Sequence, residues 1–255
     1  MTRISLAVLG SIWGFCFPTI TEAHEFIGKP ASMTAAAGSV LPVLGISSHV
    51  FMVSEELEEA KDVMMGILSN GKRAEIPLKA NDKALAFEGT VTVPTGGTFI
   101  VTGVRLPQIW ATTPDGSKPA TKKTPGATNA RKIEKFSKAL VNAKAEDNGF
   151  SAIVGDPLEI VPITNPATAK VGDEITVKVI YKGQPLTTNV YATYDGFSKE
   201  ENTYAYFTEG RADGTAKVKI THPGTWMVRV EHAAAEVTED YDRYVGRAVL
   251  LFEVK

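Results

Sequence analysis

The sequence predicts an all-β protein with two β-sandwich-like domains, the second of them immunoglobulin-like, behind an N-terminal signal peptide. Three observations support this fold class. Short runs rich in β-branched and aromatic residues alternate with polar residues, turn dipeptides such as Asn-Gly, Gly-Gly and Asp-Gly separate the runs, and long helical periodicities are few. At 255 residues the chain is long enough for two separate cores.

The first 23 residues predict a secretory signal peptide. Arg3 is followed by an apolar run over residues 4–17, by Pro18, and by a Thr-x-Ala cleavage pattern ending at Ala23. The run is shorter than the ~20 residues that a bilayer-spanning helix needs, although an uncleaved N-terminal anchor remains the alternative. We therefore expect a periplasmic protein that begins at His24 and is not inserted in the membrane after cleavage.

Composition and cysteine usage narrow the classes of function. Hydrophobic residues make up 44% and charged residues 22% of the chain, which is typical of a globular protein. The net charge is −2 and the lysines are scattered, so the sequence does not indicate nucleic-acid binding. Cys16, within the leader, is the only cysteine, and its removal would exclude a thiolate metal site or a cysteine nucleophile.

The predicted N-terminal domain, residues 24–155, begins as short strands. Residues 39–46 are rich in aliphatic residues, and residues 90–93 alternate polar with apolar side chains, as a half-buried strand does. Gly96 and Gly97 then separate this run from residues 98–104, which predicts a β-hairpin.

Four further segments of this domain have weaker patterns. Asn70-Gly71 predicts a turn, and the acidic stretch at residues 54–60 predicts a short capped helix or a helical turn whose charges face solvent. Residues 112–129 are rich in lysine, proline, glycine and threonine and predict a long exposed loop, either a lid or a mobile insertion. The spacing of apolar residues over 131–143 fits a helix, but its end could equally enter a strand.

The predicted C-terminal domain, residues 156–255, has the clearer pattern. Strands are expected at 158–161, 174–181, 190–194, 204–207, 216–220, 225–232 and 245–254. Turn residues separate them at short intervals, which is typical of a sandwich. The immunoglobulin-like prediction rests on this pattern, because the intersheet disulfide of that fold is absent.

Several segments together resemble a known bacterial family. They are the Ala-His-Glu-Phe sequence at residues 23–26, residues 47–51, residues 138–141, the Gly-x-Pro-Leu-Glu-Ile-Val-Pro run at residues 155–162, and residues 224–232 with Gly-x-Trp and a final histidine. The chain resembles a periplasmic family with a domain of unknown function, often described as the periplasmic component of a nickel or cobalt uptake system. The resemblance covers nearly all of the mature chain and implies export, a β-rich fold and a role with divalent transition metals. The acidic residues 55–59 depart from the commoner members.

The candidate metal ligands are histidines. Neutral imidazole is the commonest protein ligand for copper, nickel and zinc, but no His-x-His pair occurs here. The resemblance selects His24, His49 and His232, which fall on recurrent histidine positions of the family. His222 precedes a Pro-Gly turn and is expected to be an exposed loop residue.

We expect these three histidines to bind nickel, cobalt or copper where the two domains meet, with the α-amine of His24 as a further nitrogen ligand. Such a site would suit a carrier for metal uptake, whose partner is a membrane permease or another envelope protein. In the alternative interpretation, His49 and His232 are separate surface residues at strand ends.

Other classes of function have weaker patterns. Aromatic residues such as Trp110 could make the protein a structural or glycan-recognition module of the cell envelope, although aromatic residues at strand spacing usually belong to cores. Asp195, Glu200, Glu201 and Asp213 could form a calcium site, but Asp-Gly steps are common in turns. No nucleophile-elbow, P-loop or dinucleotide-binding motif is present, and we expect no enzyme activity.

Overall fold

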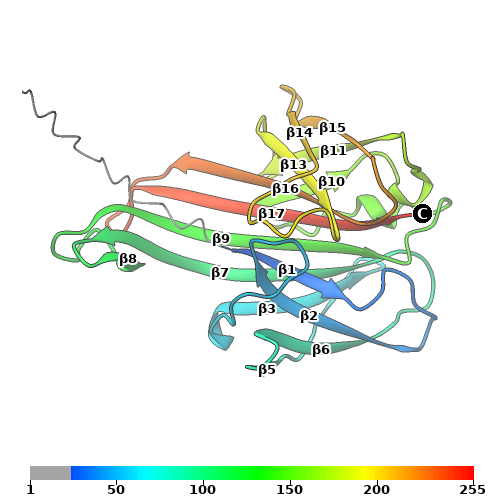
Figure 1. The fold of residues 1–255 in the computed structure, drawn as a ribbon, viewed down its shortest axis with the longest axis horizontal. Coiled ribbons are helices and arrows are strands. Elements are labelled where there is room, and N and C mark those ends of the chain that lie inside the picture. The colour runs from blue at the N-terminus through cyan, green and yellow to red at the C-terminus, as the bar shows by residue number, and fades with distance from the viewer. Residues whose placement is uncertain (1–23) are drawn as a thin grey trace, which may run out of the picture.

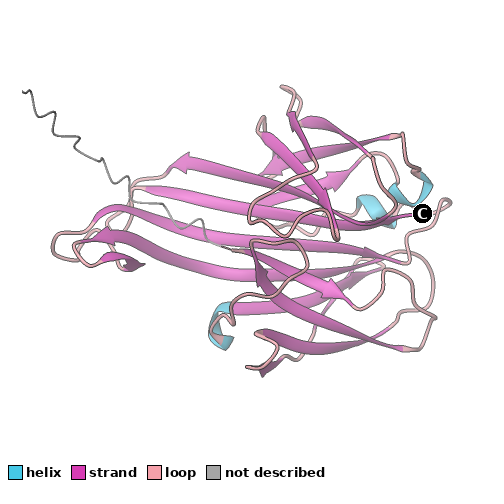
Figure 2. Ribbon diagram, in the orientation of Figure 1, coloured by secondary structure: helices cyan, strands magenta, loops and turns pink. Residues whose placement is uncertain are grey.

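The computed structural model describes residues 24–255, so the predicted signal peptide lies outside the described residues. Strands dominate the described part of the chain (Figure 2). Its only helical elements are three short 3₁₀ turns, at Ala60–Asp62, Gly149–Ser151 and Pro166–Thr168. None of the helices described is both long and apolar enough to cross a membrane. The all-β prediction is confirmed.

The strands form three sheets (Figure 1). The first has the order β1 (Glu25–Pro30), β2 (Val40–Ser48), β6 (Ala86–Thr92) and β5 (Lys79–Asn81). The second has the order β10 (Leu158–Pro162), β11 (Glu174–Tyr181) and β12 (Gln184–Pro185), with β15 (Thr215–Lys219) also paired to β11.

The third sheet has nine strands and contains the longest ones. Its order is β14 (Tyr206–Glu209), β13 (Asn189–Tyr194), β16 (Gly224–Ala235), β17 (Arg243–Val254), β9 (Thr128–Val141), β7 (Phe99–Thr113), β3 (Val63–Ser69) and β4 (Lys72–Glu75), and β8 (Gly116–Pro119) pairs with β7. Strands from both halves of the chain therefore share one sheet.

The nine-stranded sheet is the middle layer of three. Successive residues of a strand point to opposite faces, and in β9 they enter different cores. Phe136 and Leu140 pack against the second sheet, whereas Ala139 and Val141 pack against the first. Two sandwiches thus stand back to back on one shared sheet.

One parallel ladder joins the two halves. β17 pairs with β9 from Arg243 opposite Arg131 to Leu251 opposite Ala139, and every other ladder among residues 24–255 is antiparallel. The C-terminal half packs two antiparallel sheets face to face, as the sandwich prediction described. A domain boundary between residues 155 and 156 stays a prediction.

The predicted hairpin across Gly96 and Gly97 is wrong. β6 pairs with β2 and β5, whereas β7 pairs with β3, β8 and β9. Both glycines have positive φ, 87° and 66°, and they turn the chain from the outer sheet into the central one. Asp147 holds this crossing by accepting hydrogen bonds from the amide and hydroxyl of Thr98, at 2.7 and 2.6 Å.

Three other local predictions are corrected or completed. Residues 54–59 form no helix, and helical structure starts only at the 3₁₀ turn Ala60–Asp62. Residues 112–119 of the predicted loop belong to the hairpin of β7 and β8, which turns at Pro114 and Asp115, and residues 120–127 form no strand. Residues 128–141 form the strand β9, whose last nine residues are all buried because both faces of the sheet are covered.

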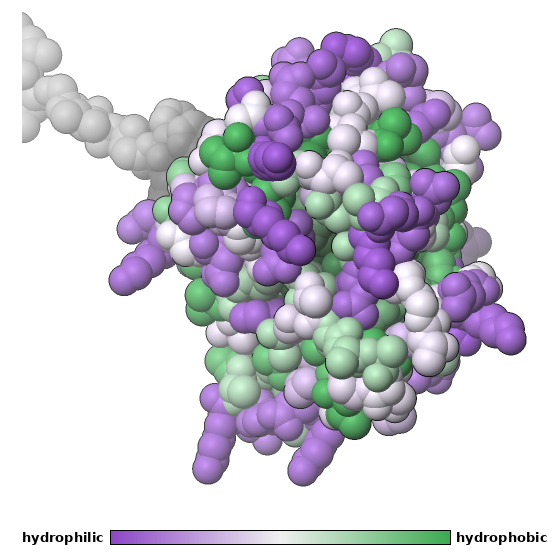
Figure 3. Space-filling view, turned by 90° about the vertical axis from the view of Figure 1, so that its right-hand side faces the viewer, coloured by the Kyte–Doolittle hydropathy of each residue, from purple (hydrophilic) through white to green (hydrophobic). Residues whose placement is uncertain are grey.

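The end of the molecule at which β17 finishes shows hydrophilic and hydrophobic side chains mixed together (Figure 3). A cavity lined by Met33, Leu140 and Phe252 among others has a volume of about 40 Å³. Small-molecule sites usually occupy about 300–1,000 Å³, so this cavity is too small to be one.

Candidate metal centre

Strand pairing brings His24 and His49 together. Glu25, the first residue of β1, is the antiparallel partner of Ser48, the last residue of β2. His24 precedes the first of these residues and His49 follows the second. The two imidazole centroids lie 3.9 Å apart, and the side chains are only 20% and 13% exposed.

Buried ion pairs fix the start of β1 over the central sheet. The Glu25 cluster consists of Glu25 and Glu231 with Arg229 and Arg247. Arg229 Nε lies 2.9 Å from Glu25 Oε1, and the two arginines lie 2.7 and 2.9 Å from Glu231 Oε2. Burial raises the pKa of Glu25, but the charges of both arginines outweigh it, so the net pKa is lowered and the carboxylate stays ionised. His24 is therefore attached to a rigid anchor.

A second anchor lies three residues along β1. The amide of Gly28 donates a 2.9 Å hydrogen bond to Ser137 Oγ on β9. A Cβ built on Gly103 of β7 would lie 3.4 Å from that same amide nitrogen and 3.2 Å from the Phe26 ring. Glycine therefore permits the close approach of β1 to the sheet.

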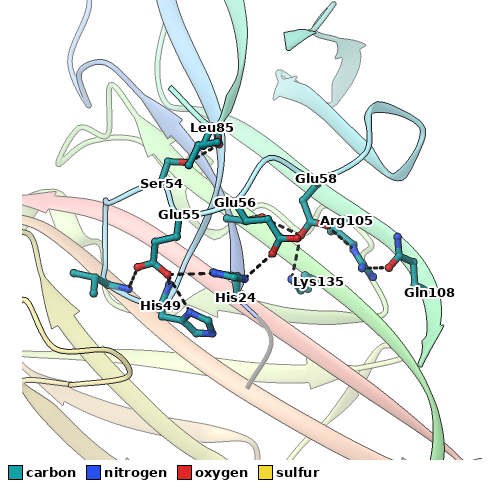
Figure 4. A network of polar contacts seen from close by, with 12 residues as sticks. His24, His49, Ser54, Glu55, Glu56, Glu58, Leu85, Arg105, Gln108 and Lys135 are labelled. Atoms are coloured by element: carbon teal, nitrogen blue, oxygen red, sulfur yellow. Dashed lines mark hydrogen bonds and ion pairs between the residues drawn. The ribbon is translucent and has the colours of Figure 1, made fainter. Parts of the chain in front are cut away.

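The segment after His49 folds back and adds a carboxylate. The amide of Glu55 donates to Ser47 O at 2.9 Å, and Ser47 and Glu56 form an isolated antiparallel bridge. The Glu55 carboxylate then accepts hydrogen bonds from the amides of His49 and Val50, at 3.1 and 3.0 Å. This reverse turn places Glu55 against both imidazoles (Figure 4).

One oxygen lies at the centre of the group. Glu55 Oε2 is 3.2 Å from His24 Nε2 and 3.0 Å from His49 Nδ1. His24, His49 and Glu55 each offer a ligand atom, and these atoms all lie within 4.8 Å of one another. Among residues 24–255 these are the residues that the structure gathers as a possible metal group.

The electrostatics favour a neutral imidazole at His24 and an ionised carboxylate at Glu55. Burial lowers the pKa of His24, and the neighbouring His49 lowers it further, although Glu56 acts in the opposite direction. Burial raises the pKa of Glu55, but hydrogen bonds from Val50 and His49 outweigh it, so the net pKa is lowered. These are the protonation states that metal ligation requires.

Glu56 occupies an outer position. Its Oε2 lies 3.0 Å from His24 Nδ1, while His24 Nε2 faces Glu55. Ligating histidines commonly donate their second ring N–H to a carboxylate, which fixes the tautomer and the ring orientation. Glu56 would have this role if Nε2 bound a metal.

A cavity of about 420 Å³ opens beside the histidines, and the Glu58 cluster forms part of its wall. This cluster consists of Glu58 with Arg105 and Lys135, whose nitrogens lie 3.4 and 3.3 Å from the carboxylate. Burial raises the pKa of Glu58, but the charges of Lys135 and Arg105 lower it more. The expectation that the charges of residues 54–60 face solvent is therefore wrong for Glu55 and Glu58, whose carboxylates point inward, whereas Glu56 and Glu59 are exposed.

The structure does not bring His232 to His24 and His49. His232 belongs to β16 on the face that carries Val228 and Val230, which pack against the second sheet, and its ring centroid lies 4.4 Å from that of Tyr181. The Glu25 cluster, and His24 beside it, lie on the opposite face. Ligation by any of the three histidines stays a prediction. His222 is in a turn and stacks on Tyr194, with centroids 4.4 Å apart.

Sequence reasoning missed Glu55. Its signal was the spacing in His49-Val50-…-Glu55, which allows a carboxylate to return to the histidine through one turn. Met52, at φ 68°, lies in that turn and carries no sequence signature for it, because a non-glycine residue rarely adopts positive φ. Trp110, the aromatic residue considered for glycan binding, lines the 420 Å³ cavity, whereas Trp226 is fully buried in a core.

Comparison with known proteins gives one family match. The model of the family described as "Domain of unknown function (DUF4198)" matches residues 21–234. Comparison with curated proteins gives no match.

Three solved structures show some likeness to the chain. The D0-D1 domain of intimin is 14% identical with a TM-score of 0.22, over 91% of this chain and 99% of that one. The ectodomain of mouse nectin-like molecule 4 is 12% identical with a TM-score of 0.22, over 91% and 64%. The adhesin InvE of Yersinia pseudotuberculosis is 13% identical with a TM-score of 0.21, over 88% and 58%. Scores this low carry no argument about function.

Proposed function

The chain belongs to the family defined by the domain of unknown function DUF4198, and we propose that it is an exported protein that binds a divalent transition metal through His24, His49 and Glu55. The observation that carries the proposal is the convergence of two imidazole nitrogens on one carboxylate oxygen, at 3.2 and 3.0 Å.

The donor set fits the proposed metals. Two imidazoles with one carboxylate suit nickel, cobalt, copper or zinc, whereas magnesium and calcium prefer all-oxygen sites. Two imidazoles 3.9 Å apart repel each other if both are protonated. A cation held by both neutral rings removes that repulsion and places positive charge beside the ionised Glu55.

Export would add a fourth donor. Cleavage after Ala23, which lies outside the described residues, would give His24 a free α-amine next to its imidazole. In this proposal the mature chain in the periplasm offers three nitrogens and one oxygen to the metal. A nitrogen-rich set of this kind favours nickel and copper.

In this proposal the protein acts as a carrier and not as an enzyme. The histidine and glutamate side chains are about one fifth exposed, so an ion can enter and leave from solvent without unfolding the protein. The resemblance of the sequence to a family linked with nickel and cobalt uptake supports the choice of metal. A membrane permease or another envelope protein would receive the ion.

Titration calorimetry with nickel, cobalt and copper tests the proposal. We expect His24→Ala, His49→Ala and Glu55→Gln each to weaken binding by at least tenfold, which is about 1.4 kcal/mol. At a free metal concentration about 100 times the dissociation constant, the parent should gain about 2.7 kcal/mol of stability in a thermal shift. Intact-mass measurement should show a secreted chain that starts at His24.

His222→Ala and His232→Ala are the matched controls, since each removes an imidazole far from the group. Both should bind metal as tightly as the parent. A parent that binds none of these metals, or a Glu55→Gln variant with unchanged affinity, would contradict the proposal. Loss of binding in His232→Ala as well as in His24→Ala and His49→Ala would return the assignment to the interdomain site expected from the sequence.

A further inference from the structure

The cavity beside the histidines has the size and lining of a small-molecule site. Its volume of about 420 Å³ lies in the range of about 300–1,000 Å³ that is usual for ligand pockets. His24 and His49 form one part of its wall, Arg131 and Ile133 of β9 form part of its floor, and Trp110 of β7 lies beside them. A metal ion alone occupies far less space than this.

The floor of the cavity carries a positive charge, that of Arg131, to which no acid is paired, although Glu56 and Glu59 also line the cavity. The four other cations on this face are paired within the Glu25 and Glu58 clusters. Among residues 24–255, neither Arg131 nor Arg243 makes an ion pair, and the Nε of Arg243 is buried without a hydrogen-bond partner. The two arginines are register partners in β9 and β17, so they project from the same face.

The local field at Arg131 is therefore positive. Burial lowers the pKa of Arg131, and the charges of Arg243 and Arg247 lower it further, more than Glu231 opposes them. An arginine next to two other arginines is stabilised when an anion arrives. Guanidinium groups bind carboxylate and phosphate through two parallel hydrogen bonds, which makes Arg131 the natural anchor.

We propose that the cavity binds a small organic anion of the carboxylate class, with its charged group on Arg131 and its apolar body against Trp110 and Ile133. Arg243 does not line the cavity and strengthens the field from the neighbouring strand. The site lies between these arginines and the His24–His49–Glu55 group.

This arrangement deepens the proposed function and, in its metal-dependent part, rests on it. The imidazoles lie in the wall of the same cavity. A second donor atom of the anion, separate from the charged group on Arg131, would therefore face a metal ion bound by the histidines. The protein would then take up the metal as a complex with an organic acid. Binding of the anion to Arg131 itself does not require the metal.

Titration of the purified protein with benzoate and with benzamide tests the proposal. The two probes have nearly the same shape, and only benzoate is charged. Benzoate should bind the metal-free protein and change the fluorescence of Trp110, and benzamide should bind at least about tenfold more weakly, as expected for loss of a charge-assisted pair. Phenyl phosphate serves as the phosphate probe, and we expect it to bind more weakly than benzoate.

Arg131→Gln should weaken benzoate binding at least about tenfold. Arg131→Lys keeps the charge but loses the planar guanidinium, so its affinity for benzoate should lie between those of Arg131→Gln and the parent. Arg211→Gln is the control, because Arg211 is an exposed arginine in the second half of the chain. Unchanged melting temperatures would show that the variants are folded.

Equal affinity of Arg131→Gln and the parent, or equal binding of benzamide and benzoate, would overturn the proposal. Tighter binding of phenyl phosphate than of benzoate would overturn the choice of carboxylate. If nickel does not bind but benzoate does so through Arg131, the proposed function fails and the anion site stands. If nickel binds and the Arg131 variants do not differ, the anion site fails alone.

Discussion

Asp156 is a carboxyl group that the fold holds more easily when it is neutral. It is half-buried, and its Oδ2 is buried without a hydrogen-bond partner among the described residues. Burial raises its pKa from the ordinary 3.8 to about 6, and the neighbouring Glu159 acts in the same direction. Lys138 and Arg73 oppose this shift without cancelling it.

The sign of the pH effect follows from this raised pKa. Between about pH 4 and pH 6 the folded state keeps the Asp156 proton while the unfolded state has lost it, so the free energy of unfolding falls as the pH rises through this window. Asp156→Asn should therefore stabilise the protein by about 1–2 kcal/mol near pH 7, because partial solvent access reduces the ~3 kcal/mol that two pKa units represent.

Urea unfolding of the parent and of Asp156→Asn across this pH range measures the effect. The stabilisation by Asp156→Asn should shrink toward zero below about pH 4, where Asp156 of the parent is protonated in both the folded and the unfolded state. A gain that does not depend on pH would show that the carboxyl is not the cause.

At the residue scale the sequence pointed to His24 and His49 but not to Glu55. The two histidines were candidates because they fall on recurrent histidine positions of the family that the sequence resembles, and the structure brings their rings together. Glu55 was not, because a glutamate in an acidic run usually faces solvent, and only the fold-back through Met52 directs it inward. The unpaired charge of Arg131 depends on which strand lies beside β9, which no local pattern specifies.

Among the elements, β9 and β10 are joined by a buried ion pair. Lys138 Nζ lies 2.7 Å from Glu159 Oε1, and the two side chains are 2% and 0% exposed. Lys138 also donates to Ala152 O at 3.1 Å, and Glu159 accepts from the amides of Val154 and Gly155. Burial lowers the pKa of Lys138, while the charge of Glu159 raises it in part. The pair fixes the segment that links the two halves of the chain.

Lys138→Met should lower the free energy of unfolding by about 3 kcal/mol, because it leaves Glu159 buried without its counter-charge. Urea unfolding at neutral pH measures this loss. Lys217→Met is a matched control, since Lys217 makes an ion pair of 2.8 Å with Glu174 between exposed side chains of β15 and β11. Solvent screens that pair, so its loss should leave the unfolding midpoint nearly unchanged. Equal effects of the two substitutions would mean that burial of the Lys138 pair has no energetic consequence.

Strand existence was predictable, and strand pairing was not. β2, β11, β13 and β17 have β-branched or alternating sequences that local preference explains. β9 could not be distinguished from a helix because it is buried on both faces, and its apolar residues therefore do not alternate. The pairing of β6 and β7 with different sheets depends on contacts far along the chain, so two glycines between strands suggested a hairpin that does not form.

For the whole molecule, the shared central sheet is the feature that sequence patterns could not reveal. Each half of the chain shows the alternation and turns of a sandwich, and this supported the all-β prediction. The parallel ladder between β17 and β9 joins residues more than 100 positions apart, from Arg131 with Arg243 to Ala139 with Leu251. Nothing in either half marks the other half as its partner.

The shared sheet predicts that the protein unfolds as one cooperative unit. The two cores lie on opposite faces of the same strands, so loss of one core removes the support of the other: Leu250 belongs to one core and Val249 and Leu251 to the other. Calorimetry of the whole protein should show a single transition whose calorimetric and van't Hoff enthalpies agree. Residues 24–155 expressed alone should fail to fold, because Ile100, Phe136 and Leu140 would lose the layer that buries them. Two resolved transitions, or a cooperative transition of the isolated 24–155 segment, would instead support two independent domains.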